Sequence, residues 1–166
     1  MKKKIIINDG IKKFNKKIEI DGDKSLSIRF LLIASQAIGR SKAFNILHSE
    51  DLLSSIKILR KLGIKIIFKK NHCEIIGQGI NGFNYKKNLT LDAGNSGTLG
   101  RCVLGALVRS PYKIKLIGDD SLSKRDFSRV IKPLKQFGAT FYPKEKKNTS
   151  HLYKRNKFFE ANKISR

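Results

Sequence analysis

Two stretches that lead into helices decide the fold: residues 21–29, DGDKSLSIR, and residues 91–101, LDAGNSGTLGR. Each places an aspartate, a serine and an arginine in the same order along the chain. The matching pairs are Asp21 and Asp92, 71 residues apart, Ser25 and Ser96, also 71 apart, and Arg29 and Arg101, 72 apart. Recurrence at a nearly fixed spacing is the signature of an internal duplication.

Hydrophobic periodicity extends this duplication through the following elements. Apolar residues at helical spacing precede Gly63, and the same pattern precedes Gly138, 75 residues later. The predicted strands are residues 3–7, 16–20, 43–47, 64–68, 73–76, 113–117 and a strand from Thr140; the predicted helices are residues 27–38, a segment between Ser49 and Gly63, 98–108 and 127–137. We expect Gly39 to stop the first helix and Pro133 to kink the last. The pattern predicts an α/β fold made of about two β-α-β-α-β-β units.

Composition says less about the function than the repeated pattern says about the fold. The chain has 166 residues, with 36 Lys and Arg against 13 Asp and Glu, which gives a net charge of +23. Such a field attracts phosphates, nucleic acid or acidic surfaces. The excess of lysine over arginine, together with abundant Ile and Asn, is also what an AT-rich coding sequence produces without selection for binding. Both interpretations stay open.

Cysteines, histidines and apolar runs set further expectations. Cys73 and Cys102 stand far apart beside apolar residues, so we expect reduced thiols in the core. His48, His72 and His151 share no metal-ligand spacing, which predicts no metal site. The N-terminal apolar run is too short for a signal peptide, and no run is long enough to span a bilayer. We therefore expect a cytoplasmic protein with no membrane partner.

The two helix starts are the candidate sites for chemistry. Lys24, Ser25 and Arg29 surround the first start, where unpaired amides and the helix dipole favour an anion such as phosphate. The alternative is that Ser25 or Ser27 only caps the helix while the two cations are solvated. At the second start, Gly97 allows a ligand close to the backbone amides. Neither loop is a Walker or dinucleotide motif, and residues 118–125 alone read as a solvated turn.

Three motifs in order carry a resemblance to a known family. They are Gly22-Asp23-Lys24-Ser25 with Arg29, residues 91–98 with Arg101, and residues 118–122 with Lys124-Arg125. Together they resemble the successive signatures of the EPSP synthase family over about residues 3–142. The resemblance implies transfer of the enolpyruvyl group of phosphoenolpyruvate to the 5-hydroxyl of shikimate 3-phosphate, with release of phosphate. It implies no metal or organic cofactor.

The resemblance also assigns roles residue by residue. Lys24, Ser25 and Arg29 would bind shikimate 3-phosphate. Lys24, Gly97 and Arg125 would bind phosphoenolpyruvate, with Asn95 and Thr98 in a supporting role. The general acid or base of the family would lie in a half that this sequence lacks, so no catalytic residue is assigned here. Two departures stand out, because Asp21 and Asp126 occupy positions where the family usually has proline.

The resemblance divides the chain into three parts. Residues 1–20 would belong with the missing domain, and residues 21–143 would form two repeats, about 21–79 and 88–143, of a substrate-binding domain. Residues 144–166, rich in Lys, Asn and Ser, read as a divergent, disordered basic tail. We expect no turnover from this chain alone, and the missing half leaves room for a separate chain that supplies it.

Other functions remain as alternatives. A basic module that binds anions or nucleic acid without catalysis would explain the charge, but no aromatic and basic RNA motif is present, so we expect no specific nucleic-acid partner. The enolpyruvyl transferase that acts on a UDP-sugar and the RNA 3′-phosphate cyclases share the architecture. Lys24-Ser25 with residues 95–98 favours the shikimate enzyme.

Overall fold

A computed structural model gives the fold of Ile6, Gly10, Lys13, Asn15 and residues 17–70, 72–142 and 157–162. Its helices are α1 (Lys24–Gln36), α2 (Glu50–Lys61), α3 (Gly97–Ala106), α4 (Asp120–Ser123) and α5 (Ser128–Gln136). Its strands are β1 (Ile38–Phe44), β2 (Lys65–Phe68), β3 (His72–Gln78), β4 (Leu89–Asp92), β5 (Ile114–Ile117), β6 (Thr140–Tyr142) and β7 (Lys157–Asn162). The predicted α/β class is confirmed.

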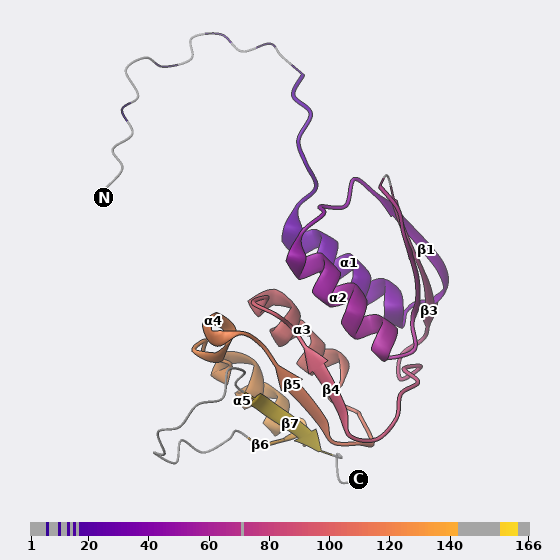
Figure 1. Cartoon of the computed structure of the whole chain (residues 1–166), viewed down its shortest axis with the longest axis vertical. Coiled ribbons are helices and arrows are strands. Elements are labelled where there is room, and N and C mark those ends of the chain that lie inside the picture. The colour runs from indigo at the N-terminus through magenta and orange to yellow at the C-terminus, as the bar shows by residue number, and fades with distance from the viewer. Residues whose placement is uncertain are drawn as a thin grey trace.

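The elements form two sheets that helices hold together. One sheet has the strand order β1-β3-β2, with both pairs antiparallel. The other has the order β4-β5-β7-β6, in which β4 and β5 are parallel and the other pairs antiparallel. Helix α1 contacts β3, α2 and α3, so it lies at the junction of the two halves. Figure 1 shows α1 and α2 beside the first sheet and α3 between them and the second.

The strand orders support the duplication that the sequence predicts. In the first unit, α1 comes first in the chain, and the strands after it lie in the sheet in the order β1-β3-β2. In the second unit, α3 comes first, and the strands after it lie in the order β5-β7-β6 with the same relative directions. Strands β1 and β5 are therefore equivalent, as are β3 and β7, and β2 and β6. The second unit has one further strand, β4, on the outer side of β5.

The first helix begins and ends earlier than expected. Asp23 is its N-cap, with an Oδ1 that accepts a hydrogen bond of 2.6 Å from Leu26 N, so α1 starts at Lys24 and the expected start at residue 27 is wrong. It ends at Gln36, and Gly39 is part of β1 rather than a helix stop. The close approach of β3 fixes this end, because a Cβ at Gly77 would lie 2.2 Å from the carbonyl oxygen of Ala34.

Two early strands also differ from the expectation. The strand expected at 43–47 is shifted to Ile38–Phe44, since Asn45 takes a left-handed backbone conformation with φ of 52° that ends it. Residues 17–20 form no strand in the described chain, and the expected strand at 3–7 lies outside the described residues. By contrast, Ser49 caps α2 through a hydrogen bond from Leu52 N, and Gly63 follows its end with φ of 86°, as predicted.

The expectation of a disordered tail is wrong for residues 157–162. They form β7, which pairs antiparallel with both β5 and β6 and so occupies the centre of the second sheet. The sequence offered no strong strand pattern there. Strand β7 is positioned by pairing partners that lie distant in sequence, which a local pattern does not report. The rest of the predicted tail lies outside the described residues.

The core lies between the helices and the inner faces of the sheets. It is built from aliphatic side chains with no more than 1% exposure, among them Leu31, Leu52, Ile75, Leu91 and Leu99. Each such side chain contributes about 1.5–3 kcal/mol by leaving water. Cys73 is in this core, as expected. Cys102 is exposed, so its predicted core position is wrong; both thiols are free.

Candidate functional site

The candidate site is built at the carboxyl ends of β4 and β5, where two loops are tied together. Gly94 N donates to the Asp92 carboxylate over 2.9 Å, and Asp119 N donates to the carbonyl of Gly94 over 2.9 Å. Gly94 has a φ of 57°, which favours glycine. A side chain at Gly118 would also meet the Gly94 carbonyl, at 2.7 Å. These contacts fix the loop that opens α3.

At the first residue of α3, two arginines converge on Gly97. A Cβ placed there would lie 2.5 Å from Nη1 of Arg125 and 3.0 Å from Nη1 of Arg101. Ser96 caps the helix by accepting a hydrogen bond from Leu99 N. The amides of the first turn, the helix dipole and two guanidinium groups therefore meet in one place, which suits a phosphate or carboxylate.

Arg101 is the functional candidate that the sequence reasoning left without a role. Arg101 follows Gly97 by four positions, about one helical turn. This spacing is the sequence signal that predicts its position beside Gly97 on the helix surface. Its guanidinium lies 5.4 Å from the centre of the Phe127 ring, and its Nη2 donates to the carbonyl of Asp126 over 3.3 Å. These contacts hold the charge beside Gly97.

Asp126, which follows Arg125, directs its carboxylate elsewhere. Its two oxygens accept hydrogen bonds from the backbone N and the hydroxyl of Ser128, at 2.7 and 2.6 Å. These bonds lower the pKa of Asp126, so the carboxylate is favoured. Within the described part of the chain, Arg125 has no ion pair with it or with another acid.

The first helix start is arranged differently. Lys24 is the first residue of α1, and its Nζ lies 3.2 Å from Oδ2 of Asp51 at the start of α2. Its side chain is still 52% exposed and accessible to a ligand. Ser25 is half-buried in the same turn and Arg29 is exposed. A side chain at Gly22 would overlap the carbonyl of Asn45, which fixes the chain where it enters the helix.

The structure brings together only part of the predicted site. Arg29 lines a cavity of about 350 Å³ between α1 and α3, together with Gln36, Cys102 and apolar neighbours. Among the described residues, no hydrogen bond or ion pair joins Lys24 or Ser25 to Gly97 or Arg125. The two helix starts lie at the same end of the molecule in Figure 1. Asn95 is exposed and Thr98 half-buried near the second start.

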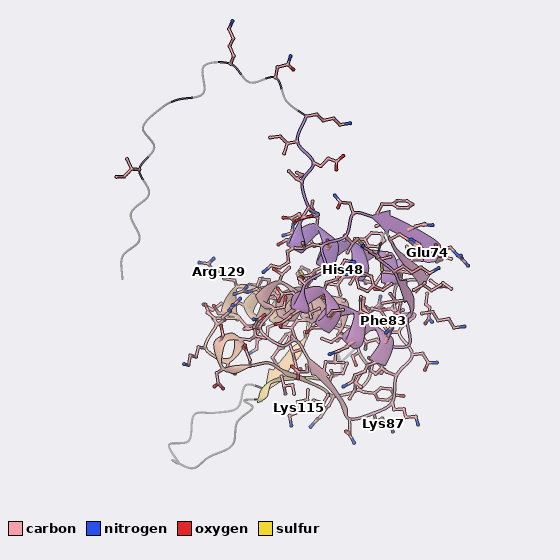
Figure 2. The ribbon with its side chains drawn as sticks, turned by 45° about the horizontal axis from the view of Figure 1, so that its top comes forward. His48, Glu74, Phe83, Lys87, Lys115 and Arg129 are labelled. Atoms are coloured by element: carbon pink, nitrogen blue, oxygen red, sulfur yellow. The ribbon has the colours of Figure 1, made fainter. Side chains whose placement is uncertain are left out.

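A separate charged cluster lies on the first sheet. The Glu74 carboxylate is within 3.1 Å of Arg40 Nη1 and Lys42 Nζ and 3.3 Å of His72 Nε2. A hydrogen bond from Lys42 is the main reason why the pKa of Glu74 is lowered. Figure 2 shows Glu74 and Arg129, in the helix after Asp126, at opposite sides of the molecule. The cluster is therefore remote from the candidate site.

The described residues contain no group of three or more His, Cys, Asp or Glu side chains that could hold a metal ion. None of their helices has the length and apolar character needed to cross a membrane.

Comparison with known proteins gives one consistent family. The family model described as EPSP synthase (3-phosphoshikimate 1-carboxyvinyltransferase) matches residues 8–164, which extends beyond residue 142 into the predicted tail. A 3-phosphoshikimate 1-carboxyvinyltransferase from Streptococcus pyogenes serotype M2 is 43% identical over 122 residues, 74% of this chain and 28% of that protein. The protein of that name from serotype M49 is 42% identical over the same length.

Solved structures agree with the sequence comparison. The structure of EPSP synthase from Acinetobacter baumannii matches with a TM-score of 0.76 and 30% sequence identity. The match covers 89% of this chain and 32% of that chain. This chain therefore spans about a third or less of the relatives it matches, 28% of the curated ones.

Proposed function

Because this chain belongs to the EPSP synthase family, we propose that it carries the part of the substrate site that holds two phosphorylated anions, shikimate 3-phosphate and phosphoenolpyruvate. The observation that supports this proposal is the convergence of Arg101 and Arg125 on Gly97 at the start of α3. The family match favours this function over a nucleic-acid-binding module.

Each predicted residue has a chemical role in the proposal. Gly97, without a side chain, admits an anionic oxygen to the first-turn amides, and Arg125 supplies a planar, bidentate donor. We assign phosphoenolpyruvate to this position, with Lys24 completing its contacts. Ser25 and Arg29 would hold shikimate 3-phosphate with Lys24. Asn95 and Thr98 would support the loop.

The proposed reaction joins the two substrates by addition and elimination. The 5-hydroxyl of shikimate 3-phosphate gives up its proton as its oxygen bonds to C2 of phosphoenolpyruvate, while C3 of phosphoenolpyruvate gains a proton. Loss of a proton from C3 and cleavage of the bond between C2 and the phosphate oxygen then restore the double bond and release phosphate. The cations of this chain would screen the repulsion between the two anions and hold them in reacting geometry. We assign the proton transfers to the part of the family polypeptide that this sequence does not contain, so we expect no turnover from this chain alone.

Calorimetric titration of the 166-residue chain with phosphoenolpyruvate tests the proposal. We expect Arg125→Ala to weaken binding by about tenfold or more, the loss of one charge-assisted hydrogen bond. Arg109→Ala is the matched control, because it removes an exposed guanidinium beyond the other end of α3 and lowers the net charge equally. Equal loss in both variants would show that general positive charge, and not this site, attracts the ligand.

A phosphate-release assay with both substrates completes the test. The unmodified chain should release no phosphate steadily, even at substrate concentrations that saturate binding. Steady release would contradict the assignment of proton transfer to the absent part.

A further inference from the structure

A second cavity adjoins the loop that opens α3. It has a volume of about 450 Å³ and lies between α2 and the end of β4, two elements that contact each other. Its lining includes Ser54, Lys57, Arg60, Lys61, Asp92 and Gly94. Sites for small molecules commonly have volumes of about 300–1,000 Å³, so this cavity can accept a small metabolite.

Helix α2 supplies three cations to this cavity. Lys57 and Lys61 are four positions apart, and Arg60 is three positions after Lys57, so the three side chains lie within about one helical turn of one another. Asp92, at the end of β4, is the one acid among the described residues that line the cavity. Three cations against one carboxylate give the cavity an excess of positive charge, which favours an anionic ligand.

Contacts within the protein position two of these cations without neutralising them. Lys61 Nζ donates to the carbonyl of Thr90 in β4 over 3.1 Å, and Arg60 Nη2 donates to the carbonyl of Ile66 in β2 over 3.0 Å. Within the described part of the chain, neither of them nor Lys57 has an ion pair. An ammonium group has three donors and a guanidinium group five, so each cation keeps donors for a ligand. Because neighbouring like charges repel, a bound anion would stabilise the cluster.

The Asp92 carboxylate gives the same cavity a hydrogen-bond acceptor. Its Oδ1 accepts a hydrogen bond of 2.9 Å from Gly94 N, and a carboxylate can accept several more. Gly94 brings this loop close to α2, because a Cβ placed there would lie 3.2 Å from the hydroxyl oxygen of Ser54. A carboxylate and a hydroxyl group therefore line the cavity together with the cations. This combination suits a ligand that carries hydroxyl groups as well as an anionic group.

We propose that this cavity is a second anion site, which binds a small phosphate ester that carries hydroxyl groups. The phosphate group accepts hydrogen bonds from Lys57, Arg60 and Lys61, and charge-assisted bonds of this kind are about twice as strong as neutral ones. A hydroxyl group of the ligand donates to Asp92. The site uses none of the residues assigned above to shikimate 3-phosphate and phosphoenolpyruvate, so it is additional to the proposed function.

Titration of the 166-residue chain with glycerol 3-phosphate, followed through amide chemical shifts in NMR spectra, tests the site. We expect the signals of residues 54–61 and 92–94 to shift and saturate. Lys57→Ala should weaken this binding about tenfold or more, the loss of one charge-assisted hydrogen bond. Lys65→Ala is the matched control, because it removes an exposed lysine from β2 and lowers the net charge equally. Inorganic phosphate, which lacks the hydroxyl groups of the ester, should bind about tenfold more weakly than glycerol 3-phosphate.

The same titration in Arg125→Ala separates this site from the one at Gly97. The shifts of residues 54–61 should persist there with the same affinity, since Arg125 does not line the cavity. Shifts confined to residues 96–101 in the unmodified chain would overturn the proposal, because the probe would then occupy the other site. Equal losses in Lys57→Ala and Lys65→Ala would also overturn it, since general positive charge would then attract the probe. Equal affinity for glycerol 3-phosphate and inorganic phosphate would overturn the role given to Asp92.

Discussion

Substituting alanine for Gly97 isolates the geometry of the candidate anion site without changing the charge of the protein. The added Cβ would lie 2.5 Å from Arg125 Nη1 and 3.0 Å from Arg101 Nη1. Carbon and nitrogen atoms need about 3.5 Å or more, so Arg125 must move by about 1 Å. Both obstructing atoms are at the ends of flexible side chains, which can rotate away. The substitution therefore displaces the guanidinium groups and blocks access to the first-turn amides.

The expected loss of affinity follows from the contacts removed. A hydrogen bond to a charged group contributes about 1.5–3 kcal/mol, and each 1.4 kcal/mol changes an affinity about tenfold. If Arg125 no longer reaches the ligand, phosphoenolpyruvate should bind about 10- to 100-fold more weakly. The net charge stays at +23, so long-range attraction is unchanged.

The effect of Gly97→Ala on the free energy of unfolding should be small, and it can be measured separately from the effect on binding. Alanine is about 1 kcal/mol better than glycine within a helix, although this gain is reduced in the first turn. We therefore expect the free energy of unfolding of Gly97→Ala to remain within about 1 kcal/mol of the original. Gly105→Ala is the matched control, because it lies in the same helix and its Cβ would meet nothing within 4 Å. Gly105→Ala should be at least as stable as the original chain and should bind phosphoenolpyruvate with the same affinity.

Calorimetric titration with phosphoenolpyruvate at low salt, together with urea unfolding, measures both quantities. Unchanged affinity in Gly97→Ala would refute the argument that this glycine admits the anion. A loss of the same size in Gly105→Ala would refute it too, since the cause would then be a general change in α3.

Two further predictions concern the reactivity of the thiols and the stability of the fold in acid. Cys73 should resist alkylation at pH 8 while Cys102 reacts, because burial raises the pKa of Cys73 to about 11 and Cys102 is exposed; mass spectrometry should find one labelled thiol in the folded chain and two after unfolding. The pKa of Glu74 is lowered below its ordinary 4.5, so its contribution to stability is present above that pH and is lost as the pH falls through the folded value. Glu74→Gln should reduce the loss of stability on acidification, measured by urea unfolding at pH 3 to 6.

The sequence predicted the elements whose signals are local. Helix α2 has a serine cap, an apolar face and a glycine after its end, and the structure confirms all three. The duplication was visible because the order of aspartate, serine and arginine in residues 21–29 recurs in residues 92–101, and because Gly63 recurs as Gly138. Strand β7 could not be predicted in this way, since its place between β5 and β6 depends on partners more than a dozen residues distant.

Part of the candidate site can be predicted from the sequence. The motifs indicate Gly97 and Arg125, but the proximity of these two residues depends on how the chain after β5 folds over α3. Leu122, with 1% exposure, anchors the short helix α4 in that connection. The role of Arg101 also emerges only from this packing, because Phe127 and the carbonyl of Asp126 hold its guanidinium.

The two helix starts of the duplicated units differ in the charged groups around them. In the first unit, the ammonium of Lys24 is paired with the carboxylate of Asp51, so an incoming anion must compete with that carboxylate. In the second, Arg101 and Arg125 approach Gly97, and neither has an ion pair within the described residues. Two neighbouring guanidinium groups repel each other, and a bound anion relieves that repulsion. The second start should therefore be the stronger anion site.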